Sequence, residues 1–452
     1  MASFLKLGSA QLAMLAALGL FAGAAAPASA ADLGGDCCAD LEERIAELEA
    51  TTARKGNRKV SLEVSGHVNQ AILWFDNGDE SNAGVYTNDN ARTRFRFKGD
   101  AKITDGWKAG YLLEIGVRAA HSGRFDQDND NAQEDDNGLD IRHSTWFIDS
   151  KSYGRVWVGL TGGANEGVTE INLAATKDVL KYSDLQDTGG GIRPVIGNDQ
   201  VGIEWRNLIG AGGSGSQAGE GARYNLVRYD TPEIFGFTGT VSWGEDDTRE
   251  VGLRYKGEFN SIKIAAGIAY GENTDGDNSG DGGGYDCAIT GGAPGKNADA
   301  DCEYVGGSIS VMHSPTGLYA NFGAGQVKDN LVSNFADGEG LDGDDTSSFY
   351  AIEAGIEQKW NALGKTTIFG QYHRADGGFQ DRDFDDVGTF GGDFILGSEI
   401  EGYAVGVIQG VDAAAMHIYL TYRHYEGEVT TEEASAEFED LDVVMGGAII
   451  RF

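Results

Sequence analysis

The sequence has very little cysteine and proline, and few basic residues for its length. Among 452 residues there are 4 Cys and 5 Pro, and 35 Lys and Arg stand against 71 Asp and Glu, which gives a formal net charge of −36. This acidic excess argues against a nucleic-acid-binding protein, because no surplus of cations is available to neutralise phosphates. Beyond the N-terminal segment no window approaches 18 consecutive apolar residues, so no transmembrane helix is expected.

Sequence signals of catalysis and of metal binding are missing as well. There is no G-x-S-x-G motif, no Walker loop, and no zinc-type spacing among the scattered His and Cys residues. The stretch DQDNDNAQEDDNG (126–138) is similar to a calcium loop, but it has neither Gly at its sixth position nor Glu at its twelfth. We interpret it as a solvated acidic loop, with weak binding of divalent cations as the alternative. No enzyme activity, cofactor or metal is predicted.

The first 30 residues have the layout of a secretory signal peptide. Lys6 precedes an apolar centre at about 12–26, and the segment ends on Pro27 and the small residues 28–30. Cleavage after Ala30 is favoured over retention as a membrane anchor, because a small-residue ending after Pro is typical of a cleavage site. The mature protein is therefore expected to be exported, to a place where disulfides can persist.

Residues 31–57 are predicted to form a short amphipathic leader. A 3-4-3-4 spacing in this segment indicates a helix with an a/d seam. The seam consists of Cys38, Leu41, Ile45, Leu48 and Thr52. Two heptads are too short to be stable alone, so we favour a small coiled coil that joins copies of an oligomer; a lone helix packed on the rest of the chain is the alternative.

Beyond Gly56 the apolar period changes to two, the period of a strand with one apolar face. Sixteen such segments span 59–75, 91–103, 107–118, 141–149, 155–161, 222–230, 237–244, 249–258, 261–271, 303–313, 317–327, 348–360, 366–374, 398–409, 415–425 and 441–451. Short links alternate with long ones rich in Asp, Asn and Gly. This asymmetry and the even strand number predict an all-β transmembrane fold, a 16-stranded antiparallel up-and-down barrel over 58–452 that closes its own edges.

Four stretches carry a resemblance to a known family. They are RFRFKGD (94–100), NLVRYDTPEIFGF (225–237), VSLEVSGHVNQAIL (60–73) and the ending LDVVMGGAIIRF. With these stretches the chain resembles the 16-stranded bacterial outer-membrane porins, specifically the alphaproteobacterial type with a coiled-coil leader. The resemblance implies a homotrimer of water-filled pores in the outer membrane, with the leader in the periplasm. It also implies that the third long link, about 162–221, folds into the barrel, and that the terminal Phe452 is a signal for the barrel-insertion machinery.

The stretch NARTRFRFKGD places four cations on one face of a strand, opposite aromatic residues. In a barrel these cations would line the water-filled interior while Phe95 and Phe97 meet lipid or a neighbouring subunit. Arg118 shares the polar face of the next strand, and the family motifs place Arg142 and Arg228 on the wall as well. The predicted basic wall therefore consists of Arg92, Arg94, Arg96, Lys98, Arg118, Arg142 and Arg228. The acids predicted on the third link are Glu166, Glu170, Asp178, Asp184 and Asp187. The link lacks the PEFGG turn of enterobacterial relatives, so which of these acids face the cations is left open.

The predicted function is passive diffusion of ions and small hydrophilic solutes through this pore. A substrate-specific channel for sugars or organic anions is the alternative, and a barrel enzyme or adhesin would need a catalytic set or activity in the acidic loops. Cys287 and Cys302 are predicted to form a disulfide in the fifth long link, worth about 3 kcal/mol in the chain-entropy picture. The expected partners are membrane lipid and lipopolysaccharide, the insertion machinery and the solutes themselves.

Overall fold

The structure is a computed structural model in which the described residues begin at Lys59. They comprise 59–117, 120–127, 138–209, 217–274, 301–330, 332, 343–379, 395–432 and 434–452. The chain divides into two compact units, Met1–Arg58 and Lys59–Phe452, and all described residues belong to the second. The predicted signal peptide and the coiled-coil seam lie outside the described residues.

Eighteen strand segments form one sheet. They are β1 (Glu63–Asp76), β2 (Ser81–Thr87), β3 (Arg94–Thr104), β4 (Trp107–Val117), β5 (Leu139–Ser150), β6 (Gly154–Gly162), β9 (Arg223–Asp230), β10 (Phe237–Gly244), β11 (Arg249–Phe259), β12 (Ile262–Asn273), β13 (Cys302–His313), β14 (Leu318–Asp329), β15 (Thr346–Gln358), β16 (Thr366–Gly377), β17 (Ile395–Val411), β18 (Met416–Thr431), β19 (Ser435–Glu437) and β20 (Leu441–Arg451). A separate small hairpin pairs β7 (Val195–Ile196) with β8 (Asp199–Gln200).

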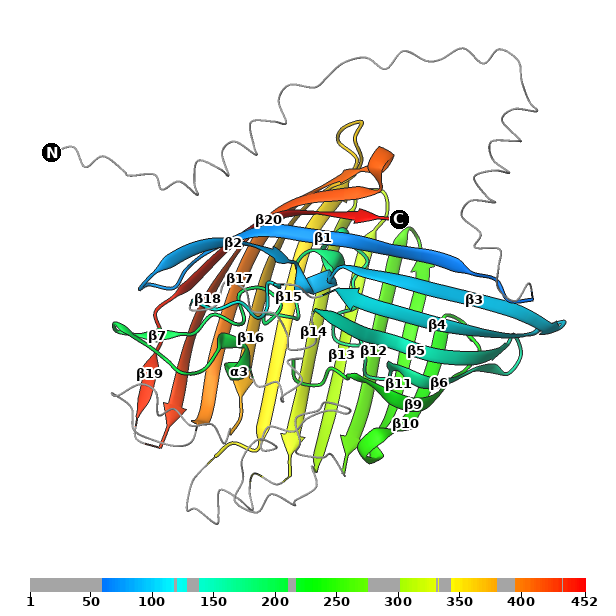
Figure 1. Ribbon diagram of the computed structural model, residues 1–452, viewed down its shortest axis with the longest axis horizontal. Helices are drawn as coiled ribbons and strands as arrows, with labels where there is room; N and C mark the ends of the chain where they lie inside the picture. Colours follow the sequence, from blue (N-terminus) through cyan, green and yellow to red (C-terminus); the bar gives the residue numbers. More distant parts are fainter. Residues whose placement is uncertain are drawn as a thin grey trace. The chain divides into compact units, whose positions relative to one another are not determined.

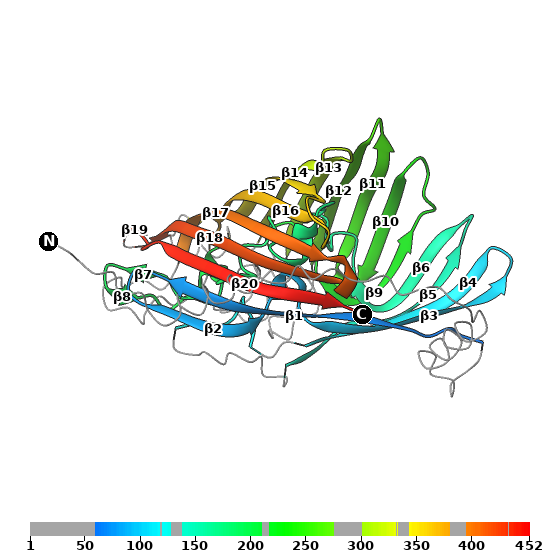
Figure 2. The ribbon, with the colours of Figure 1, turned by 90° about the horizontal axis from the view of Figure 1, so that it is seen from above.

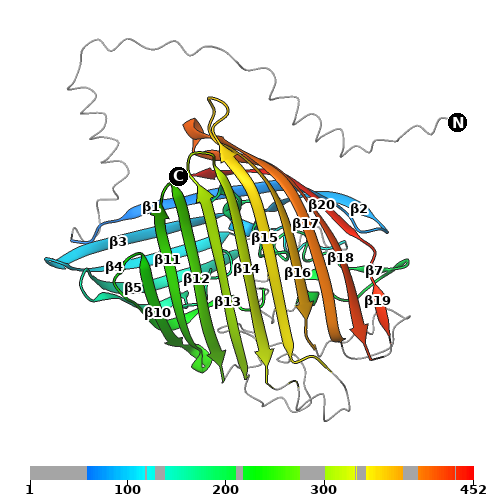
Figure 3. The same ribbon diagram turned by 180° about the vertical axis from the view of Figure 1, so that it is seen from behind.

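The sheet is a closed antiparallel barrel of sixteen strands. Segments β2 and β3 pair with the two halves of β1, and β19 and β20 pair with two parts of β18, so each of these pairs counts as one interrupted strand. The barrel closes where β1 pairs with β20, from His67 opposite Arg451 to Asp76 opposite Asp442. Figures 1 and 3 show the barrel from opposite sides, with β1 and β3 to β6 crossing in front of or behind β10 to β18, and Figure 2 shows it from above. The predicted sixteen-stranded barrel is confirmed.

The period-two pattern explains the wall. In β1 the outward Val64, Val68 and Ile72 are about half exposed, whereas the inward Asn69 and Leu73 are fully buried. Successive side chains of a strand point to opposite faces, so each strand presents an apolar row outward without a long apolar run in the sequence. The buried inward residues show that the interior of this wall is covered by other parts of the chain.

Sequence reasoning located the strands well and missed two breaks in them, one between β2 and β3 and one between β19 and β20. The segment 81–87, predicted as part of a long link, is β2, and residues 91–93 precede β3 because the 3₁₀ turn η2 (Asp89–Ala91) interrupts the strand. Residues 164–182 contain only one short element, the 3₁₀ turn η3 (Ala175–Asp178). Two further 3₁₀ turns, η4 (Glu245–Asp247) and η5 (Asp412–Ala414), lie between strands. Among the described residues, no helix is sufficiently long and apolar for a membrane span.

Between β6 and β9, the described residues 163–209 and 217–222 form what we call the inner segment, which lies against the inward face of the barrel. It carries β7, β8 and the short helix α3 (Trp205–Leu208); Figure 1 shows α3 in front of the strands β16 and β17, and Figure 2 shows β7 and β8. Trp205 packs on Tyr425 of β18 and on Phe438, with ring centroids 5.8 Å and 5.3 Å apart. The main apolar core is therefore formed between the inner segment and the wall.

Candidate functional site

Three arginines of the predicted basic wall converge on one carboxylate. Glu114 on β4 is fully buried, and its Oε1 lies 2.8 Å from Nε of Arg142 on β5 and 3.4 Å from Nη1 of Arg94 on β3. Its Oε2 accepts a hydrogen bond from Nε of Arg96 at 2.6 Å. Cross-strand pairing explains the meeting, because Arg96 is directly opposite Glu114 in the β3–β4 register. A single carboxylate is thus shared by three guanidinium groups, so this cluster carries a net positive charge.

The remaining predicted wall residues are placed differently. Arg92 follows η2 and is neutralised by Asp140, 2.6 Å away, and by Asp89, 3.1 Å away. Lys98 is exposed on β3. Arg228 on β9 pairs with Asp230 at 2.8 Å and donates to the main-chain carbonyls of Gly162 at 3.0 Å and Gly163 at 3.4 Å, so it holds the start of the inner segment. Arg118 lies outside the described residues.

One predicted acid of the inner segment faces an arginine of the wall in this region. Glu166 forms an ion pair with Arg223 on β9, and its main-chain carbonyl accepts a hydrogen bond from Arg254 on β11. Burial opposes the ionised form, but the neighbouring guanidinium of Arg223 outweighs it and lowers the pKa of Glu166 to about 2. The carboxylate is therefore charged throughout the physiological range. Sequence reasoning missed Arg223 and Arg254. Arg254 has the inward parity of β11, whereas Arg223, the first residue of β9, shares its parity with the exposed Asn225 and Val227 and could not be found by parity.

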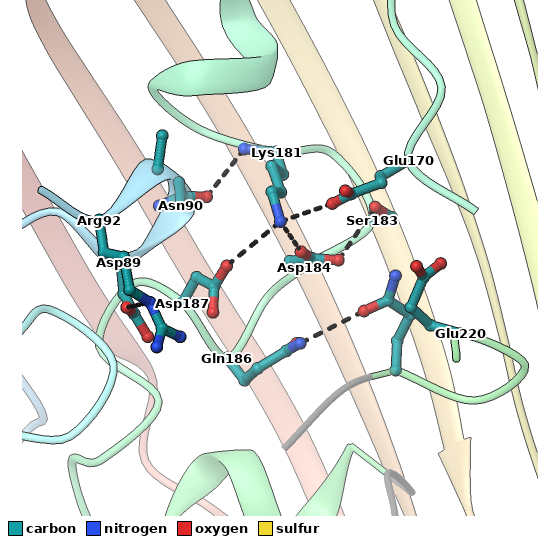
Figure 4. A network of polar contacts seen from close by, with 12 residues as sticks. Asp89, Asn90, Arg92, Glu170, Lys181, Ser183, Asp184, Gln186, Asp187 and Glu220 are labelled. Carbon is teal, nitrogen blue, oxygen red and sulfur yellow. Dashed lines mark hydrogen bonds and ion pairs between the residues drawn. The ribbon is translucent and has the colours of Figure 1, made fainter. Parts of the chain in front are cut away.

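Three further predicted acids surround a lysine of their own segment (Figure 4). Nζ of Lys181 lies 2.5 Å from Glu170, 2.7 Å from Asp184 and 3.8 Å from Asp187. Burial works against a charged ammonium, yet these carboxylates, Asp184 foremost, raise the pKa of Lys181. Three carboxylates share one cation, and burial raises the pKa of Glu170 and of Asp187. These acids face Lys181, which sequence reasoning had not singled out, rather than the arginines around Glu114.

The fifth predicted acid, Asp178, forms an ion pair with Arg451 of β20. This contact joins η3 to the last strand of the barrel, next to the β1–β20 closure. Terminal Phe452 is exposed, and its main-chain N–H and C=O bond to Gly66 of β1 at 3.0 Å and 2.9 Å. The chain end is thus part of the closing seam.

The opposite wall holds the inner segment through its main chain. Arg423 on β18 is fully buried and donates to the carbonyls of Lys181 at 2.9 Å and Asp184 at 3.1 Å. Gln371 on β16 donates to the carbonyl of Leu180 at 2.7 Å, and Glu353 on β15 accepts from the Thr176 hydroxyl at 2.7 Å. Because carbonyls of an irregular segment need donors when they are buried, these wall side chains determine where the segment lies.

Two other predictions fall partly or wholly outside the described residues. Cys302 is buried at the start of β13, whereas Cys287 lies outside them, so the disulfide stays a prediction. Most of the acidic stretch 126–138 also lies outside them. Within the ranges that are described, no group of three or more His, Cys, Asp or Glu side chains is arranged to hold a metal ion.

The comparison with protein families assigns the chain. A family profile described as Gram-negative porin matches residues 13–443, which is most of the sequence. The chain belongs to the Gram-negative porin family. The alphaproteobacterial type of porin stays a prediction. The comparison with curated proteins found no match.

Solved structures similar to this porin share little sequence with it. The anion-selective porin from Comamonas acidovorans is 17% identical, with 87% of this chain and 100% of that chain covered and a TM-score of 0.49. OmpT of Vibrio cholerae is 12% identical, with coverages of 88% and 99% and a TM-score of 0.48. Salmonella typhi OmpF, in a complex with daunomycin, is 13% identical, with coverages of 87% and 98% and a TM-score of 0.49.

The family and the closed barrel together indicate a channel protein of the outer membrane. The Gram-negative porin family and its barrel fold are those of channel proteins rather than of enzymes. An apolar outer face and a charged interior are what such a channel requires, because lipid meets the first and water the second. The charged residues described above are thus the candidate functional site of this porin.

Proposed function

We propose that this porin forms a water-filled channel for passive diffusion of ions and small hydrophilic solutes, narrowed by the inner segment. The observation that carries the proposal is the uneven cover of the interior. The inner segment is bonded to β11, β13, β15, β16 and β18, whereas Arg96 on β3 keeps 41% of its side chain exposed. The solute path then runs along β3 to β5 and β9, between the Glu114 cluster and the Glu166–Arg223 pair.

The charge balance along this path supports a preference for anions. Arg94, Arg96 and Arg142 surround the single carboxylate of Glu114. In a narrow passage between low-dielectric walls, such an excess of positive charge favours anions over cations. The net charge of −36 acts in the opposite direction at the mouth, where it raises the local concentration of cations. We propose that the arginine cluster around Glu114 determines the ion selectivity, rather than the net charge of the chain, because the cluster lies where the solute path is narrowest.

The proposed orientation of the barrel in the membrane and its assembly rest on the resemblance of the sequence to outer-membrane porins. The short turns and both ends of the barrel domain would face the periplasm, with Phe452 read by the insertion machinery, and the long acidic links would face outward towards lipopolysaccharide. A homotrimer is proposed on the same ground. A disulfide between Cys287 and Cys302 would then close the fifth long link just above the start of β13.

Single-channel recording under a salt gradient tests the proposal. Arg96→Ala removes the most exposed charge of the cluster, and Arg249→Ala removes an equal charge from the outward face of β11 as a control. We expect openings in groups of three, a reversal potential that shifts towards cations in Arg96→Ala, and no shift in Arg249→Ala. An unmoved reversal potential in both variants would leave a channel but remove the cluster from its narrow part.

The same recordings distinguish the alternative, a substrate-specific channel for sugars or organic anions. A specific channel binds its solute, so current should be blocked in a saturable manner as an organic anion is added. A general-diffusion channel shows a conductance that rises in proportion to salt, without saturation. Correctly folded protein that gives no conductance at all would contradict both forms of the proposal.

A further inference from the structure

The turn between β9 and β10 places an aromatic side chain where backbone geometry disfavours one. Ile234 and Phe237 exchange both main-chain hydrogen bonds, each 2.9 Å long, which leaves Phe235 and Gly236 as the two central residues. Both have positive φ, 52° for Phe235 and 86° for Gly236. A two-residue turn of this kind favours Asn or Asp followed by Gly, and a bulky side chain is strained at its first position.

Two other short turns of the barrel contain polar residues, whereas Tyr153 in the β5–β6 turn and Trp360 in the β15–β16 link are exposed aromatic residues. Between β11 and β12, Asn260 and Ser261 occupy the two central positions with φ of 48° and 64°. The β3–β4 turn is also polar, with the side chain of Asp105 96% exposed and paired with Lys102. Turn chemistry thus accounts for those two turns. It does not account for Phe235, which is 95% exposed and gains no packing within the chain.

The surroundings of Phe235 continue the outer apolar face of the barrel. Ile234 and Phe237, which flank the turn, are both exposed, and the ring of Phe237 lies 4.7 Å from that of Tyr255 on β11. On the neighbouring hairpin Phe259 and Ile262 face each other across the strands and are exposed too. Farther along β10, Val241 has the same outward parity and is half exposed. The turn is therefore the tip of one apolar surface that begins on the wall.

We propose that the Ile234–Phe237 turn inserts into the membrane leaflet at the short-turn end of the barrel, with Phe235 as its anchor. A lipid surface is the partner that this chemistry fits, because the tip is continuous with the face that contacts lipid, and an aromatic ring is favoured at the boundary between acyl chains and headgroups. An exposed strained residue is explained when its side chain is used outside the chain. The inference rests on the proposed function, since it requires the barrel to be embedded in a bilayer.

Depth-dependent quenching tests the insertion. The parent is the full chain with Cys37→Ser and Cys38→Ser. Single cysteines are introduced into it by Phe235→Cys, Val241→Cys or Asp105→Cys. Each variant is labelled with the fluorophore NBD in the absence of reductant. The labelled proteins are reconstituted into phosphatidylcholine vesicles, with nitroxide on the lipid or in the water phase. The parent chain with the two serines passes through the same labelling as the blank.

We expect lipid nitroxide to quench the label at 235 about as strongly as the label at 241, and the aqueous quencher to act mainly on 105. If lipid nitroxide quenches the label at 241 but the label at 235 is quenched mainly by the aqueous quencher, the turn does not insert, although the barrel is embedded in the bilayer. Such a result would favour a periplasmic protein as the partner of this tip. Failure of lipid quenching at 241 would contradict the embedded barrel itself, so the two failures are distinguishable.

A second variant tests the side chain rather than the position. Phe235→Asn restores the residue that the same geometry carries at Asn260, so turn chemistry alone predicts equal or greater resistance to unfolding. If Phe235 anchors the turn in the membrane, the opposite is expected in vesicles: Phe235→Asn should have a lower melting temperature than the unmodified chain. An equal or higher melting temperature in vesicles would overturn the role of the ring.

Discussion

Arg423 on β18 donates to the main-chain carbonyl of Asp184 in the inner segment at 3.1 Å, across 239 positions of the sequence. The same guanidinium also reaches the carbonyl of Lys181 and the side chain of Gln371. A buried cation is here compensated mainly by carbonyl oxygens of the segment that it holds. The position of the inner segment consequently depends on wall residues that take no part in the Glu114 cluster.

Replacing this arginine should release the segment. Arg423→Met removes several hydrogen bonds from a charged donor, and each such bond contributes about 1.5–3 kcal/mol. We expect a lower melting temperature together with larger, noisier single-channel currents, because the inner segment moves in the lumen. Arg374→Met, on the outward face of β16, is the matched control and should leave the current unchanged. Quiet currents of normal size in Arg423→Met would show that other contacts suffice.

The lysine of the inner segment should be needed most at neutral pH. Lys181→Met leaves Glu170, Asp184 and Asp187 without their shared cation, and breaking such a buried pair costs about 3 kcal/mol. The pKa of Glu170 and of Asp187 is already raised, so the fold favours their protonated forms, and their contribution to stability falls as pH rises through those values.

Melting temperatures at pH 5 and pH 8 measure this effect. The destabilisation by Lys181→Met should be clearly smaller at pH 5, where the carboxylates are more readily neutralised. Lys177→Met, at an exposed lysine of the same segment, should behave like the wild type at both values. A loss that is equal at both pH values would assign Lys181 a packing role instead.

The Glu166–Arg223 pair should resist acid. The pKa of Glu166 falls from 4.5 to about 2, so its contribution is fully present above 4.5 and is lost only as pH falls towards 2. At 1.36 kcal/mol per unit, the shift corresponds to about 3 kcal/mol. Chemical unfolding of Glu166→Gln and wild type should therefore differ by a constant amount from pH 7 to pH 5, and the difference should shrink below pH 4. A difference that already disappears at pH 5 would contradict the strength of this pair.

The carboxylate of Glu114 should limit the anion preference of the channel. Glu114→Gln leaves Arg94, Arg96 and Arg142 without a counter-charge, at a cost of about 3–5 kcal/mol for an uncompensated buried charge. Protein that folds should show a reversal potential shifted further towards anions. Glu303→Gln, exposed on the outward face of β13, controls for the change in net charge. A shift of equal size in both variants would attribute the effect to the net charge of the chain.

The barrel could be predicted from the sequence alone. The number of strands, their positions to within a few residues and the direction of each side chain follow from a local period of two, which neighbouring residues set without reference to the rest of the chain. Even the wall position of Arg96 was predictable, because a strand fixes which face its side chains share. The breaks after β2 and before β20 were not, since both lie in polar stretches without a clear period.

The pairing of the interior charges, in contrast, depends on the three-dimensional fold. Arg96 meets Glu114 through strand register, Lys181 collects three carboxylates through the path of an irregular segment, and Arg423 reaches Asp184 from the far wall. No local period determines such contacts, because they depend on how a long link without regular structure satisfies its buried carbonyls and carboxylates. The sequence could therefore state that a charged interior exists, while the fold decided which charges cancel and which remain available to a solute.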